Sequence, residues 1–238
     1  PNDYPDVNDP TDPDDPTRGK TDDYVVFESG LAEGSSPNAN DILVDSSFTL
    51  SALDGLKDDN AITFTVTGEA DITLNKADVE ALSTTSKSIT TEYGELVLNG
   101  YTLNADGTIT IDYEYTLTEA PENTASDGSD ADKFTDDTIS IKVNDRDTDT
   151  KTENLVIRIM DDVSSAEDDA NQVTEGDDVT SSSTAIGNVM GGMGVSAGDV
   201  ADSQGADGAD VSGITSTNVP ANVATDTAGV LEIDGQYG

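Results

Sequence analysis

The chain has 238 residues, with 50 Asp and Glu against 10 Lys and Arg, which gives a formal net charge of −40 at pH 7. This charge disfavours nucleic acid and anionic membranes as partners, because phosphate binding needs a basic footprint. The sequence contains neither Cys nor His, which excludes disulfides, structural zinc and nearly all nucleophile–base catalysis.

The first predicted element is an acidic linker. Residues 1–23 are dominated by Pro and Asp and contain almost no apolar side chains. Proline favours extended backbone, and like charges extend it further, so we predict a semi-rigid linker. A Pro-rich recognition motif is the alternative for this segment.

From residue 24 the pattern changes to short runs rich in Val, Ile, Thr, Tyr and Phe, which largely alternate with polar residues as in half-buried strands. We predict strands at residues 24–27, 47–53, 61–68, 94–103, 108–117, 138–143 and 154–160. The sequence NADG at 104–107 predicts a hairpin turn. NKADVEALS at 75–83 predicts one short helix with Asn75 as its N-cap. This spacing predicts an all-β fold, an immunoglobulin-like or cadherin-like β-sandwich.

Beyond the acidic junction at 161–172 the chain restarts. VVFESGLAEG (25–34) is similar to QVTEGDDVTS (172–181), and TEYGEL (91–96) is similar to DGQYG (234–238). Glu28 precedes Gly94 by 66 residues and Glu175 precedes Gly238 by 63, which indicates a repeated unit. We therefore predict tandem sandwiches: a complete repeat at 24–162 and the first half of a second at 163–238. Half a sandwich exposes strand edges, so the second unit is truncated, split or completed by another chain.

The order of VFESGLAEG (26–34), YGELVLNG (93–100), YTLNADGTITIDYEYTL (101–117) and IKVNDRDTDT (141–150) resembles the repeat domains of giant adhesins exported by type I secretion. These are the RTX-type adhesins with cadherin-like or VCBS-like repeats, and the resemblance covers residues 24–238. It implies a protein that is secreted to the bacterial cell surface and folds there in the presence of calcium. It also implies a structural extender that projects ligand-binding modules for attachment or biofilm formation.

The same resemblance implies which partners the chain would have. Neighbouring repeats of the same chain are expected, and a sugar, peptide or surface ligand would be reached through adjacent modules, without membrane insertion. A ligand-binding split module of the same adhesin class is the alternative function. A halophilic acidic domain, in which the charge serves solubility, is a third interpretation.

Clustered carboxylates are candidate ligands for Ca²⁺, which prefers hard oxygen donors and would screen the self-repulsion of the chain. In NDRDTDT (144–150) three acidic residues alternate, so their carboxylates could converge on one side; a solvated hairpin loop is the alternative. A second group lies at the junction of the two units, where an interdomain Ca²⁺ would relieve repulsion; a flexible acidic linker is the alternative. Glu28 is the equivalent of Glu175 and could coordinate against the Asp-rich linker before it. The candidate ligands are Glu28, Asp145, Asp147, Asp149, Asp161, Asp162, Asp168, Asp169 and Glu175.

No catalytic site is predicted. Paired carboxylates are the only available machinery, and they are too abundant here for any one pair to carry meaning. The acidic loop at 126–137 resembles a calcium-binding loop but lacks the spacing of a helical EF-hand, so a solvated loop is favoured and calcium ligation is the alternative. Tyr93, Tyr101, Tyr113 and Tyr115 could form a sugar platform, but packing in the core is the favoured role for at least half of them.

Overall fold

The computed structural model describes residues 24–52, 54–122, 134–147, 149–165, 202–209, 225–227 and 230–232. Two compact units divide between Asp207 and Gly208. The described part of the second unit is a ribbon of two strands, β10 (Thr225–Thr227) and β11 (Val230–Glu232). The predicted linker and most of the predicted second half-repeat lie outside the described residues, so that division of the chain stays a prediction.

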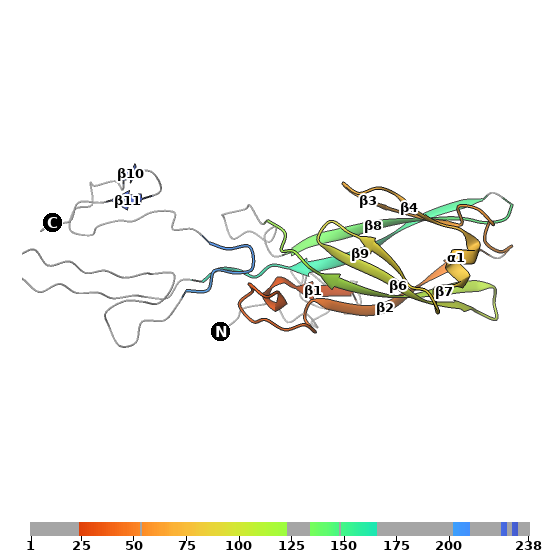
Figure 1. Cartoon of the computed structure of the whole chain (residues 1–238), viewed down its shortest axis with the longest axis horizontal. Coiled ribbons are helices and arrows are strands. Elements are labelled where there is room, and N and C mark those ends of the chain that lie inside the picture. Colours follow the sequence, from red (N-terminus) through yellow and green to blue (C-terminus); the bar gives the residue numbers. More distant parts are fainter. Residues whose placement is uncertain are drawn as a thin grey trace, which may run out of the picture. The chain divides into compact units, whose positions relative to one another are not determined.

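The first unit is built from two facing sheets (Figure 1). One sheet has the strand order β1-β9-β8-β3-β4 and the other has the order β2-β7-β6-β5. All strands of the two sheets pair in antiparallel fashion except β1 and β9, which are parallel. The strands are β1 (Val25–Phe27), β2 (Leu43–Ser51), β3 (Ile62–Val66), β4 (Ile72–Leu74), β5 (Lys87–Thr90), β6 (Gly94–Leu103), β7 (Thr108–Leu117), β8 (Phe134–Asn144) and β9 (Thr150–Met160).

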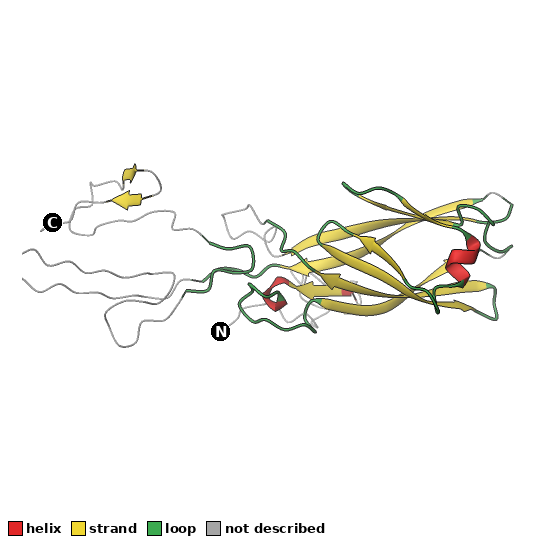
Figure 2. Ribbon diagram, in the orientation of Figure 1, coloured by secondary structure: helices red, strands yellow, loops and turns green. Residues whose placement is uncertain are grey.

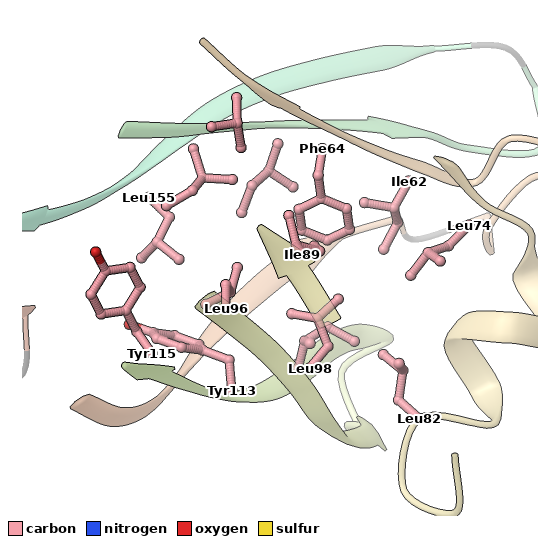
Figure 3. Close-up of a cluster of buried hydrophobic side chains, with 14 of the residues drawn as sticks. Ile62, Phe64, Leu74, Leu82, Ile89, Leu96, Leu98, Tyr113, Tyr115 and Leu155 are labelled. Carbon is pink, nitrogen blue, oxygen red and sulfur yellow. The ribbon is translucent and has the colours of Figure 1, made fainter. Parts of the chain in front are cut away.

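One hydrophobic core fills the space between the sheets. Strand β7 shows the pattern: every second residue from Ile109 to Leu117 is buried, because successive side chains of a strand point to opposite faces. Both sheets contribute to a single cluster of buried side chains, including Phe64 and Tyr113 (Figure 3). Burying a large apolar side chain stabilises the fold by about 1.5–3 kcal/mol. The predicted all-β sandwich is therefore confirmed.

The predicted helix and hairpin turn are present in the structure, because their cap and turn residues have strong conformational preferences. Helix α1 (Lys76–Glu80) lies inside the predicted range with Asn75 at its N-cap, and the Asp78 carboxylate accepts a hydrogen bond from the Asn75 amide at 3.0 Å. The predicted hairpin turn is closed by Gly107 at φ +86°. No helix among the described residues is long and apolar enough to cross a bilayer.

Other elements differ from the predicted ones. Strand β2 begins at Leu43, four residues before the predicted start at 47, because Asp45 and Ser47 pair with Glu114 and Asp112 of β7 despite their polar character. Strand β8 likewise begins before the predicted start. Neither β4 nor β5 is predicted, since three or four residues are too few to show a periodic pattern.

The long β8–β9 hairpin defines two opposite ends of the sandwich. Its turn lies beyond Asn144, which pairs with Thr150, while at the other end Phe134 pairs with Met160. At about 3.3 Å per residue, these two ends are roughly 33 Å apart. Figure 2 shows α1 at the hairpin end and the short 3-10 turn η2 (Glu28–Gly30), which follows β1, at the other end.

Candidate metal centre

Glu28 is a buried carboxyl group at the end of the sandwich opposite the hairpin. Its exposed fraction is 0%, although acidic side chains are almost never fully buried unless they are paired. Its Oε2 accepts one long hydrogen bond, 3.4 Å from the backbone N–H of Asp162. Its Oε1 is buried and has no hydrogen-bond partner. A buried polar atom without a partner costs about 1–3 kcal/mol, and more if it is charged, so this oxygen calls for a ligand.

The parallel pairing of β1 and β9 explains why acidic groups meet here. Phe27 pairs with Met160 in the same direction, so the residues that follow each strand leave the sheet side by side. Glu28 follows β1, and Asp161 and Asp162 follow β9; the latter two are 9% and 2% exposed. Three carboxyl groups from two distant parts of the sequence are thereby brought to one end of the sheet.

Asp162 is held in place by the loop that follows η2. Its Oδ2 accepts a hydrogen bond from the Ser35 backbone N–H at 2.7 Å, and its Oδ1 accepts one from the Ser35 hydroxyl at 2.5 Å. The loop turns tightly enough that a Cβ at Gly34 would lie 2.6 Å from the backbone oxygen of Glu28. The ESGLAEGS sequence thus shapes a loop that orients Asp162 beside Glu28.

A later segment of the chain returns to the same end. Ser203 and Ser165 exchange two backbone hydrogen bonds of 2.9 Å. Gly205 is buried at φ +72°, and a Cβ there would overlap the backbone carbonyl oxygen of Asp162. This close approach brings Asp207 near enough for its charge to act on Glu28.

The electrostatics of this site favour a cation. Burial is the main cause that raises the pKa of Glu28 to about 8, and the charges of Asp161, Asp207 and Asp162 add to it, while the hydrogen bond from the Asp162 amide opposes it. A divalent cation would reverse each of the unfavourable contributions. The donors are carboxylate oxygens without nitrogen or sulfur, the type that Ca²⁺ prefers, but among the described residues only the oxygens of Asp145, Asp147 and Asp149 all lie within 4.8 Å of one another, so a cation here would have to draw the carboxylates closer together. We refer below to Glu28, Asp161, Asp162 and Asp207 as the Glu28 site.

Glu28 lies beside the acidic residues that follow its own sandwich. The Asp-rich linker at 1–23, against which Glu28 is also predicted to coordinate, lies outside the described residues, so that contact stays a prediction. Asp168, Asp169 and Glu175 lie outside the described residues. Asp207 was not identified as a candidate ligand from the sequence alone. It belongs to the sequence GADGAD at 205–210, and the Gly between its two acidic residues was the signal that could have identified it.

A second acidic cluster lies at the hairpin end. Asp145, Asp147 and Asp149 each place one carboxylate oxygen within 4.8 Å of the others, as their alternation predicts. Asp145 Oδ1 also accepts a hydrogen bond from the Asp149 amide at 2.8 Å, and a hydrogen bond with Asp147 is the main cause that raises the pKa of Asp145. Among the described residues, no buried polar atom without a partner occurs in this cluster. The geometry is therefore compatible both with a cation and with a solvated hairpin loop.

The four tyrosines do not form a platform. Tyr113 and Tyr115 are fully buried in the core, and Tyr93 and Tyr101 are half-buried against it. The hydroxyl of Tyr115 donates a hydrogen bond of 2.8 Å to Asp137, another fully buried acidic residue. Packing is thus the role of these side chains.

Comparison with known proteins adds little to this geometry. No protein-family model and no curated protein matches the sequence. Among solved structures, the chain is similar to the crystal structure of ACE19, the collagen-binding subdomain of the Enterococcus faecalis surface protein ACE, with 14% identity over 50% of this chain and 75% of that one. The TM-score of 0.14 is too low to support an argument about either fold or ligand. The sandwich is established by its own strand pairing and core.

Proposed function

We propose that this chain is a structural extender segment of a bacterial surface adhesin, and that Ca²⁺ bound at the Glu28 site stabilises it. One observation carries the proposal: the fully buried Glu28 has a carboxylate oxygen without a hydrogen-bond partner, beside two further buried acidic residues. Such a group destabilises a fold unless a cation neutralises it. Bound Ca²⁺ supplies that neutralisation and takes oxygen ligands from several segments at once.

The mechanical consequence follows from where the ligands come from. Glu28 follows the first strand, Asp161 follows the last strand of the sandwich, and Asp207 belongs to a segment more than 40 residues further on. An ion that these groups share ties the sandwich to the chain that leaves it. The proposed role of calcium is therefore to stiffen the exit from one repeat, which an extender needs in order to transmit force and keep its length.

The hairpin end is proposed as a second calcium site, where the three carboxylate oxygens already lie within 4.8 Å of one another. Its three aspartates lie roughly 33 Å from the Glu28 site, because β8 and β9 run the length of the sandwich. Replacing Asp147 with Asn should lower the calcium stoichiometry measured by isothermal titration calorimetry, whereas replacing the exposed Asp54 with Asn should leave it unchanged. Unchanged stoichiometry in both variants would identify the hairpin as a solvated loop.

The adhesin class, secretion to the cell surface and the tandem array are supported by the resemblance of residues 24–238 to RTX-type adhesin repeats. The alternative is a split ligand-binding module of the same class. Retention of this chain alone on a glycan or peptide array would favour the module over the extender.

Calcium binding itself is tested by thermal unfolding at fixed ionic strength. We expect the unfolding midpoint to rise with micromolar to millimolar Ca²⁺ and to fall on chelation, because an ion that binds only the folded state stabilises it by mass action. Glu28→Gln should remove the part of this rise that the Glu28 site contributes, and the part due to the hairpin site should remain. Glu33→Gln, an exposed position on the same loop, is the matched control and should retain it. If Na⁺ replaces Ca²⁺ at equal ionic strength, the halophilic interpretation is correct and the site is not specific.

A further inference from the structure

Strands β1 and β9 are the places where the chain enters and leaves the sandwich. Strand β1 is the first strand that the structure describes, and β9 is the last strand of the two facing sheets. The two strands are direct neighbours, with Val25 opposite Arg158 and Phe27 opposite Met160. Because they run in parallel, the chain enters β1 at the end of the pair marked by Val25 and leaves β9 at the end marked by Met160.

This arrangement decides how the two strands respond when the chain is stretched. Tension pulls β1 toward its amino end and β9 toward its carboxyl end, so the strands are driven past each other along their common axis. The evenly spaced hydrogen bonds of a parallel pair are then loaded together. In the antiparallel β8–β9 hairpin, whose open ends lie side by side at Phe134 and Met160, tension on those ends would instead break one pair after another. A pair loaded in shear therefore resists a larger force than a pair that is peeled apart.

Tension does not need to cross the rest of the sandwich. Since β1 and β9 pair directly, force that enters at the first strand passes to the last strand without crossing the opposite sheet. The strands between them in the sequence bear the load only after β1 has separated from β9. The pairing of these two strands therefore determines the force at which the sandwich opens.

Further contacts hold β1 against sliding. The Val26 side chain, in the middle of β1, is fully buried in the core. Just past the ends of the two strands, the Asp162 backbone N–H donates a hydrogen bond to Glu28, and the Asp162 carboxylate accepts two from Ser35 at 2.7 and 2.5 Å. Sliding of β1 past β9 must break these contacts together with the ladder between the strands.

We propose that the β1–β9 pair is a mechanical clamp, which keeps the sandwich folded when the chain is under tension. The load-bearing role of this clamp rests on the proposed extender function, and its reinforcement by calcium rests on the proposed Glu28 site. Glu28 directly follows β1 and Asp161 directly follows β9. An ion bound by both carboxylates would therefore join the two loaded strands at their ends.

Pulling experiments with two arrangements of the attachment points test the clamp. The chain contains no Cys, so single cysteines at exposed positions can serve as handles for optical tweezers. Handles at the amino terminus and at Val163→Cys load the clamp in shear. Handles at Glu33→Cys and Val163→Cys peel it, because these exposed residues follow the adjacent ends of β1 and β9. In chelator and at equal constant force, we expect the folded sandwich to survive at least about tenfold longer in shear than in peeling.

A matched pair of substitutions separates mechanical from thermodynamic stability. Val26→Ala in β1 and Val66→Ala in β3 remove the same methyl groups from side chains that are 0% and 4% exposed, so both should destabilise the protein to a similar extent in urea. Only contacts that are lost in the transition state of unfolding change the unfolding rate. In shear, Val26→Ala should therefore shorten the lifetime about tenfold, and Val66→Ala should shorten it less than about twofold. Equal shortening by the two variants would overturn the clamp.

Calcium distinguishes failure of the clamp from failure of the proposed metal site. In saturating Ca²⁺ the lifetime of the wild type in shear should rise at least about tenfold above its value in chelator, and that of Glu28→Gln, which keeps the hairpin aspartates, should not. A longer lifetime in shear than in peeling, with no effect of calcium, would uphold the clamp and refute the Glu28 site. Equal lifetimes in the two pulling arrangements would refute the clamp, whatever the effect of calcium.

Discussion

Replacing Glu28 with Gln should change the stability of the protein in opposite directions with and without calcium. Without the ion, the folded state must hold a buried carboxyl group whose pKa is raised from 4.5 to about 8. At 1.36 kcal/mol per pH unit this difference has an upper bound of about 5 kcal/mol, and we expect about 2–3 kcal/mol after solvent screening and the cost of burying the Gln amide. With saturating calcium, Gln removes a charged ligand and forfeits about 3 kcal/mol of binding stabilisation at 100-fold excess over Kd.

The sign of the pH dependence follows from the same pKa. The unfolded chain releases the Glu28 proton near pH 4.5, while the calcium-free folded protein keeps it until about pH 8. The folded state therefore binds more protons in this window, and its stability falls as pH rises from about 4.5 to about 8 and then levels off. The general repulsion among carboxylates acts in the same direction, so the informative quantity is the difference between wild type and Glu28→Gln at each pH.

Differential scanning fluorimetry in chelator and in calcium, at pH 5.5 and pH 8.5, measures all four conditions. In chelator at pH 8.5, Glu28→Gln should melt about 6 °C above the wild type, taking roughly 3 °C per kcal/mol for a domain of this size. At pH 5.5 this advantage should shrink, and in calcium the order should reverse. A variant that is less stable than the wild type by the same amount in every condition would refute the reasoning, because Glu28 would then be a structural residue that needs no cation.

Two other substitutions test the buried Tyr115–Asp137 hydrogen bond and the close approach of Gly205 to Asp162. Tyr115→Phe removes the hydroxyl that donates to the buried Asp137, and should cost about 1.5–3 kcal/mol in urea unfolding, whereas Tyr101→Phe, at a half-buried hydroxyl, should cost little. Gly205→Ala should weaken calcium binding about tenfold in calorimetry without unfolding the sandwich, since its Cβ would overlap a backbone carbonyl. Gly208→Ala has a similar positive φ but open space around its Cβ, so it should bind calcium as the wild type does; equal effects of the two would show that backbone strain alone is responsible.

The parts of the fold that the sequence predicts are those fixed by local chemistry. The alternation at 108–117 and the NADG turn determine the β6–β7 hairpin within 24 residues of chain, and the alternating aspartates at 145–149 predict their own convergence. The Glu28 site is different. Glu28 and Asp161 are 133 residues apart, and only the parallel pairing of β1 with β9 brings them together. A three-residue strand carries no signal for the direction or register of its pairing. The sequence therefore places the acidic residues at the junction of the two predicted units but does not identify which residues lie beside them.

Asp207 was missed for a related reason. Its segment is rich in Gly and Ala, a composition that indicates a loop but does not indicate what the loop packs against. Its position is set by Gly205, whose missing side chain allows the backbone to approach Asp162. The requirement for glycine is visible only when the partner surface is known.

The distribution of apolar contacts explains why a cation, if bound as proposed, would contribute most at this end of the sandwich. Between the sheets, a continuous core of Ile, Leu, Val, Phe and Tyr stabilises the strands independently of any ion. The returning segment at 202–207 is held mainly by other contacts: Ala206 packs against the core, the Gly205 backbone lies against that of Asp162, and two backbone hydrogen bonds join Ser203 to Ser165. Asp207 meanwhile adds repulsion toward Glu28. A Ca²⁺ shared by these carboxylates, as proposed, would convert the repulsion between Asp207 and Glu28 into an attraction that strengthens the attachment of this segment.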